Sequence, residues 1–142
     1  MADDGYQLYQ LLKKDPRFTF EAYQFVRESL GYAQDVLKLG KESPSPGGKP
    51  DVRPAGERER HLTGPQLCEA VRIYALEQYG YMARAVLKSW GLESTGHVGD
   101  IVYNLIDIGW MKKSATDRRE DFDNVYDFAE VFENDFEISS ID

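Results

Sequence analysis

Cys68, His61 and His97 are the side chains of this sequence whose types could supply a nucleophile and its base. A cysteine attacks as a thiolate, and a nearby histidine commonly takes up its proton at neutral pH. Cys68 and His97 can be paired in this way, but no signature of a cysteine enzyme surrounds Cys68. Cys68 lies beside Leu67 on a predicted helix, where cysteine is more often a small buried apolar residue. We therefore expect no catalytic residue and predict that the protein is not an enzyme.

Metal and phosphate sites are not supported by the spacing of their usual ligands. Two histidines and one cysteine that lie far apart in the sequence do not make a zinc site. Asp121-Phe122-Asp123 begins like a calcium-binding loop, but the following Asn-Val-Tyr lacks the next oxygen ligand and the glycine. Gly47-Gly48 has no strand before it and no helix after it, so it does not match a phosphate loop. The sequence predicts neither a metal nor a cofactor.

Charge is distributed unevenly along the chain. The formal net charge is −8, yet residues 120–142 carry nine acidic residues and no Lys or Arg, so the remainder is nearly neutral. Five large rings alternate with these carboxylates: Phe122, Tyr126, Phe128, Phe132 and Phe136. We expect the rings to pack on the body of the protein, because leaving them in water would be costly. The alternative is an acidic-aromatic segment that binds a basic partner surface.

Cysteine usage and hydropathy indicate the compartment. A single cysteine cannot form an intrachain disulfide, which is typical of proteins from a reducing compartment. The first twenty residues include the charged Asp3, Asp4, Lys13 and Lys14 and no continuous apolar stretch, and no run elsewhere is long enough to span a bilayer. We expect a cytoplasmic protein without a membrane segment.

Three regions can be distinguished along the 142 residues, a length typical of one domain. Residues 1–39 contain two predicted helices, the second with an apolar stripe from Phe20 to Leu37. Residues 40–61 are rich in Gly and Pro, which indicates a flexible linker. Residues 62–142 hold the helical core and the acidic C-terminal segment. Because 39 residues are too few to bury their own rings, we expect the N-terminal helices to dock on this core.

The helical core begins with a strong helix-start signal. Thr63 can cap the helix, Gln66 completes a capping box, and Pro65 suits the first turn. A glycine follows each of three apolar stripes, and we expect these glycines to end three helices within residues 64–108.

The pattern changes in residues 110–128. Trp110-Met111 is followed by a polar stretch and then by alternating rings, which fits a β-hairpin with a polar tip. A loop that leads into a last helix with Phe128, Val131 and Phe132 fits equally well. We favour the hairpin. The predicted fold class is therefore α+β and mainly helical, with helices followed by a β-hairpin in the order of a winged helix-turn-helix.

Four basic residues would lie at the tip of this hairpin, and they are our candidate interaction residues: Lys112, Lys113, Arg118 and Arg119. The third helix of a winged helix reads DNA, yet residues 96–108 contain no Lys or Arg and only Asn104 could address base edges. We expect the four residues to form a solvated tip that keeps an edge strand soluble. Contact with nucleic acid or the ribosome is the alternative.

Several motifs resemble those of a short bacterial family of uncharacterised proteins. The motifs are ALEQYG (75–80), VLKSWG (86–91), GDIVYNLI (99–106) and REDFDNVYDF (119–128), preceded by FEAY (20–23) and RHLTG (60–64). The resemblance covers most of the chain except residues 40–58. It implies a bacterial origin and a single domain. The family has no established activity, so the resemblance implies no mechanism.

The sequence favours a protein-interaction or regulatory module whose partner is another protein. Two alternatives stay open. One is a winged-helix-like protein associated with nucleic acid or the ribosome. The other is an enzyme that uses carboxylates of the C-terminal segment, such as Asp121, Asp123 and Asp127, which would require a concave site. The oligomeric state and the identity of a partner do not follow from the sequence.

Overall fold

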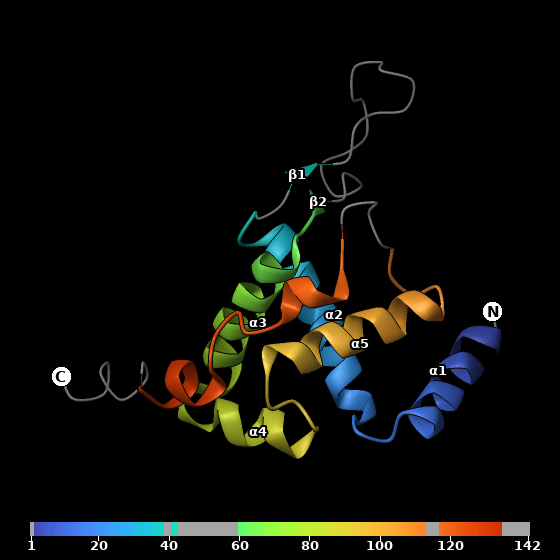
Figure 1. The fold of residues 1–142 in the computed structure, drawn as a ribbon, viewed down its shortest axis with the longest axis horizontal. Coiled ribbons are helices and arrows are strands. Elements are labelled where there is room, and N and C mark those ends of the chain that lie inside the picture. The colour runs from blue at the N-terminus through green and yellow to red at the C-terminus, as the bar shows by residue number, and fades with distance from the viewer. Residues whose placement is uncertain (1, 39–40, 43–59, 113–116, 135–142) are drawn as a thin grey trace.

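The computed structural model describes residues 2–38, 41–42, 60–112 and 117–134, and these residues form a helical fold (Figure 1). The five α-helices are α1 (Ala2–Lys14), α2 (Phe20–Asp35), α3 (Gly64–Tyr79), α4 (Ala83–Ser89) and α5 (Thr95–Asp107). Shorter helical turns are η3 (Gly80–Met82), η4 (Arg119–Phe122) and the π-helical η5 (Glu130–Asn134). The two-residue segments β1 (Lys41–Glu42) and β2 (Arg60–His61) pair antiparallel, but they are too short to form a layer of the fold.

α2 lies at the centre of the fold and packs against α3 and α5 (Figure 1). The Phe25 ring lies 5.3 Å from that of Tyr74 on α3 and 5.6 Å from that of Trp90 at the end of α4. This aromatic cluster joins a helix that precedes residues 43–59 to helices that follow them. Phe20 departs from the predicted stripe, because this first residue of α2 is 47% exposed.

The start and end signals of the core helices are confirmed. Thr63 Oγ1 accepts a hydrogen bond from the Gln66 amide at 3.2 Å, and Gln66 Oε1 accepts one from the Thr63 amide at 3.0 Å. This is the predicted capping box. Gly80, Gly91 and Gly109 follow α3, α4 and α5 with φ values of 54°, 94° and 81°. Glycine adopts this left-handed region without the steric cost that a Cβ would add.

The predicted hairpin is wrong for the described residues, and with it the winged-helix arrangement and the α+β class. Residues 117–134 form η4, an irregular stretch and η5, close to the alternative of a loop and a last helix. Several of their backbone amides donate to nearby carbonyls or to side chains instead of to a partner strand. The Asp123 amide donates to Glu120 O at 3.0 Å, and the Val125 amide donates to Thr95 Oγ1 at 3.2 Å.

The rings of this segment pack on the helices instead of on a second strand. Phe122, Phe128 and Phe132 are buried, and the last two meet edge to face with centroids 5.0 Å apart. Tyr126 Oη donates to a backbone carbonyl of α3 at 2.6 Å. The expected packing of the rings on the body is therefore confirmed for these four, whereas Phe136 lies outside the described residues.

Candidate functional site

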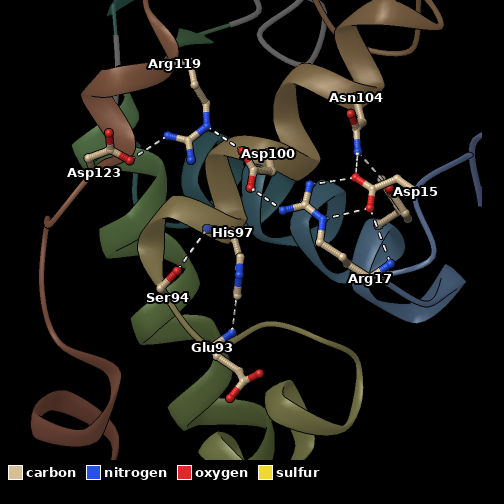
Figure 2. A network of polar contacts seen from close by, with 10 residues as sticks. Asp15, Arg17, Glu93, Ser94, His97, Asp100, Asn104, Arg119 and Asp123 are labelled. Carbon is tan, nitrogen blue, oxygen red and sulfur yellow. Dashed lines mark hydrogen bonds and ion pairs between the residues drawn. The ribbon is translucent and has the colours of Figure 1, made fainter.

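A row of alternating charges crosses one face of α5 (Figure 2). Asp100 of α5 lies at its centre: Oδ2 accepts from Arg17 Nη1 at 3.0 Å, and Oδ1 accepts from Arg119 Nε at 2.7 Å. Each arginine binds a second acid on its outer side, Asp15 for Arg17 and Asp123 for Arg119, at 2.8 Å in both cases. This ion-pair row joins the loop between α1 and α2 to α5 and to η4.

The contacts of the ion-pair row favour the charged forms of Asp15, Arg17 and Arg119. Hydrogen bonds from Arg17, with a further one from Asn104 Nδ2 at 3.0 Å, hold the pKa of Asp15 well below its usual range. The bond to Asp15 in turn raises the pKa of Arg17. Burial opposes the charge of Arg119, but its bonds to two carboxylates outweigh this effect and raise its pKa. Both arginines stay protonated near neutral pH, so the ion pairs persist and hold three segments of the chain together.

Two glycines let η4 approach the helices closely. A Cβ added to Gly99 of α5 would lie 2.7 Å from Phe122 Cβ, and one added to Gly64 of α3 would lie 3.1 Å from Asp121 Cβ. Both distances are shorter than ordinary contacts between carbon atoms, so a larger residue would displace η4. Gly99 and Gly64 thus allow η4 to pack directly on α5 and on the start of α3.

A pocket of about 270 Å³ lies between η4, α5, the start of α3 and α2; we call it the η4 pocket. Much of its wall is apolar, including Leu30, Leu67, Val102, Ile106 and Phe122. Charged side chains of both signs complete it: Lys112, Asp117, Arg118 and Asp121.

Two residues that line the η4 pocket have a buried side-chain atom without a hydrogen-bond partner among the described residues. Tyr103 Oη and Trp110 Nε1 are shielded from solvent and make no hydrogen bond to the described residues. Burial, reinforced by the negative charges of Asp117 and Asp121, raises the pKa of Tyr103, so its hydroxyl keeps its proton. A buried donor left unpaired costs roughly 1–3 kcal/mol. These two atoms are therefore the least satisfied polar groups of the site.

A second hollow adjoins the η4 pocket and is open to solvent. This α2 groove, of about 550 Å³, lies between α1, α2 and the residues after α5, and it includes Leu8 and Phe20. Trp110 and Met111 line both hollows, so they form a shared wall. On the groove side, the Arg27 guanidinium lies 4.9 Å from the centroid of the Trp110 ring.

The structure gives different contacts to the three described members of the basic group that the sequence predicts. Lys112 and Arg118 line the η4 pocket, whereas Arg119 belongs to the ion-pair row. Lys113 lies outside the described residues. The sequence did not predict the role of Asp100 or the unpaired polar atoms of Tyr103 and Trp110, although the spacing of Asp100 was informative. Asp100 and Asn104 are four residues apart, which places them on one face of a helix.

The candidate nucleophile and base are both in inert surroundings. Cys68 is buried, and burial raises the pKa of its thiol to about 12, which is the opposite of an activated cysteine. His97 Nδ1 accepts from the Glu93 amide at 3.1 Å, and its ring packs edge-on against Phe18 at 5.4 Å. The side chain of His61 lies outside the described residues.

The three C-terminal carboxylates serve three different local structures. Asp121 lines the η4 pocket, and Asp123 pairs with Arg119. Asp127 Oδ1 accepts from the Ala129 amide at 2.8 Å and so caps the last helix. These side chains do not converge on one site. In the described part of the chain, no three His, Cys, Asp or Glu side chains are grouped so that they could hold a metal ion.

No protein-family model, curated protein or solved structure matches this chain. None of the helices in the described residues has the length and apolar character needed to cross a membrane. Function is therefore inferred from the contacts and pockets of the structure.

Proposed function

We propose that the protein is a cytoplasmic protein-interaction module that docks an amphipathic segment of a different protein in the α2 groove. The observation that carries this proposal is the Phe20 ring, which lines the groove and is 47% exposed. Large apolar side chains at an open hollow are typical of binding surfaces, where a partner removes them from water.

α1 carries a second exposed aromatic surface, on the side of the helix that faces away from the α2 groove. The helix lies at the edge of the fold (Figure 1), with Leu8 and Leu11 buried and Tyr6 and Tyr9 exposed on the opposite side. Lys13 Nζ lies 4.7 Å from the centroid of the Tyr9 ring, which holds part of the outer face in place. Tyrosines are enriched at interfaces because they combine apolar area with a polar end. The exposed side of α1 is therefore a separate surface of interface-type composition, which agrees with an interaction module but does not belong to the groove.

The chemistry of the groove defines its occupant. Leu8, Phe20 and Met111 offer apolar contact, which suits a large apolar anchor from a helix or an extended segment. Arg27 and Glu28 are both exposed at the groove, and the guanidinium of Arg27, next to Trp110, is the group that would attract a carboxylate close to that anchor. We infer a partner segment in which a large apolar residue lies beside an acidic one.

Association with nucleic acid is a weaker proposal on these contacts. Arg119 is bound by two carboxylates, and Lys112 and Arg118 line a pocket that Asp117 and Asp121 share. Such a mixed surface does not make the basic patch that phosphate binding requires. An enzyme built from Asp121, Asp123 and Asp127 is likewise weakened by their separation. Membership of the short bacterial family remains a proposal that rests on the motifs alone.

Photo-crosslinking at single positions tests the proposed docking. A photoreactive phenylalanine replaces Phe20 in one variant and Tyr81, which is 73% exposed and outside the groove, in the control. We expect the Phe20 variant to capture one protein that the Tyr81 variant does not capture. Capture of a second copy of this chain, or of a nuclease-sensitive species, would replace the proposed partner with one of those classes.

Binding measurements with the captured protein complete the test. The Phe20→Ser variant should bind it at least about tenfold more weakly, as expected for loss of an aromatic anchor. The Tyr81→Ser variant should bind like the unmodified protein. Equal binding by all three proteins would contradict docking in the α2 groove.

A further inference from the structure

We propose that the η4 pocket binds a small, mainly apolar molecule that carries one hydrogen-bond-accepting group, a carboxylate or a carboxamide. This inference is independent of partner docking in the α2 groove, because it rests on a different set of atoms. Those atoms are the two unpartnered donors on Tyr103 and Trp110.

The dimensions of the pocket limit the ligand. A volume of about 270 Å³ falls just below the range of roughly 300–1,000 Å³ that is usual for ligand pockets. Val102, Ile106 and Phe122 supply apolar surface to its wall. The site therefore suits a compact molecule with a single ring or a short aliphatic body.

The unpartnered atoms determine the polarity of the ligand. The indole N–H of Trp110 can only donate, and the protonated hydroxyl of Tyr103 is available to donate as well. A ligand that satisfies them must accept hydrogen bonds. Both atoms are shielded from solvent while their side chains are only half-buried, so a ligand reaches them only after these side chains shift.

The charged residues restrict the net charge of the ligand. Lys112 is exposed, and the Arg118 side chain is 71% exposed, with its Nε 3.8 Å from Oδ1 of Asp121. These flexible cations can approach a carboxylate. Asp117 and Asp121 line the same pocket and would repel a second negative charge. A monoanion or a neutral amide therefore fits, and a phosphate dianion does not.

Nuclear magnetic resonance of the full chain tests this proposal through the indole N–H groups. The sequence has two tryptophans, Trp90 and Trp110, and a Trp110→Phe variant assigns their resonances. The probes are 3-phenylpropionate and 3-phenylpropanamide, with 3-phenylpropylamine as a control of similar shape that carries a cation in place of the acceptor. We expect the acid or the amide to shift the Trp110 indole resonance in a saturable manner, and the amine to leave it in place.

Variants of two tyrosines separate specific binding from surface adsorption. Tyr103→Phe keeps the ring and removes the unpartnered hydroxyl, so affinity for the probe should fall about fivefold, the equivalent of one hydrogen bond. Tyr32→Phe is the control, because the Tyr32 hydroxyl donates to Glu77 at 2.5 Å outside the pocket. Thermal unfolding of each variant verifies that it is folded.

Three results would overturn the proposal. The first is that neither the acid nor the amide moves the Trp110 resonance at millimolar concentration. The second is that the amine moves it equally. The third is that Tyr103→Phe and Tyr32→Phe bind the probe with the same affinity as the unmodified protein. Loss of partner capture at Phe20 would leave this inference intact, because Tyr103, whose substitution tests it, lines the η4 pocket and not the α2 groove.

Discussion

Phe122 occupies the space that a side chain on Gly99 would need, since an added Cβ would come within 2.7 Å of Phe122 Cβ. This contact places η4 directly on α5. The neighbouring residue on one side, Asp121, lines the η4 pocket, and Arg119 enters the ion-pair row. One close approach between a glycine and a ring thus positions both parts of the candidate site.

A methyl group at Gly99 should therefore destabilise the protein. Alanine in place of glycine inside a helix usually adds up to about 1 kcal/mol of stability. At Gly99 the clash with Phe122 should reverse the sign and lower the free energy of unfolding by about 1–3 kcal/mol. Gly31→Ala on α2 is the matched control, because nothing lies within 4 Å of its added Cβ. Urea denaturation should show opposite shifts for the two variants; a stabilised Gly99→Ala would refute the close contact.

Asp100 should contribute to stability through both arginines of the ion-pair row. Asp100→Asn keeps the shape of the side chain but removes the charge between Arg17 and Arg119. We expect a loss of about 1 kcal/mol at low salt, modest because Arg17 is half exposed, and a smaller loss in 1 M salt. Asp107→Asn, at an exposed position of the same helix, should change little. Equal effects of the two substitutions would show that the row does not hold the three segments together.

Asp15 should make stability depend on pH in a defined direction. Its pKa in the folded protein lies below its ordinary value, so its contribution is complete above that ordinary value, near 4. The contribution is lost as the pH falls toward the lower folded pKa. Asp15→Asn should therefore be less stable than the unmodified protein at pH 7, by about 1 kcal/mol. Urea midpoints should converge below pH 4, and a gap that stays constant with pH would contradict the pairing.

Two tyrosine hydroxyls should affect stability with opposite signs. Tyr126 Oη donates to Cys68 O at 2.6 Å, so Tyr126→Phe removes this hydrogen bond between the C-terminal segment and α3 and should lower stability by about 1 kcal/mol. Tyr103 Oη has no partner among the described residues, so Tyr103→Phe should leave stability unchanged or raise it by up to about 1 kcal/mol. Thermal unfolding compares them. A large destabilisation by Tyr103→Phe would mean that its hydroxyl is already satisfied.

The helices were predictable because their signals are local. Thr63 and Gln66 lie three residues apart, and the capping box needs no other part of the chain. The glycine that follows each core helix is equally local. Residues 117–134 are different, because the positions of Phe122 and Phe128 are set by packing on helices distant in sequence. The sequence shows that rings alternate with polar residues, a pattern that fits a strand. It does not show that these rings pack on distant helices, and for this reason the predicted hairpin is wrong.

The candidate site could be predicted only in part for the same reason. Lys112 and Arg118 were singled out, and both line the η4 pocket. Arg119 was grouped with them because it is adjacent in sequence, yet its partner Asp100 is 19 residues earlier. Arg17 binds the same Asp100 across 83 residues. Pairings over such separations depend on the tertiary fold, which a charge pattern does not encode.

The central claim, that the α2 groove docks an acidic-flanked apolar segment of another protein, is tested most directly by the peptide captured in cells at the Phe20 position. We predict a peptide from one other protein, with a large apolar residue beside an Asp or Glu, and no such peptide at Tyr81. The claim would be contradicted if both positions captured the same set of peptides, or if the peptide from Phe20 came from this chain.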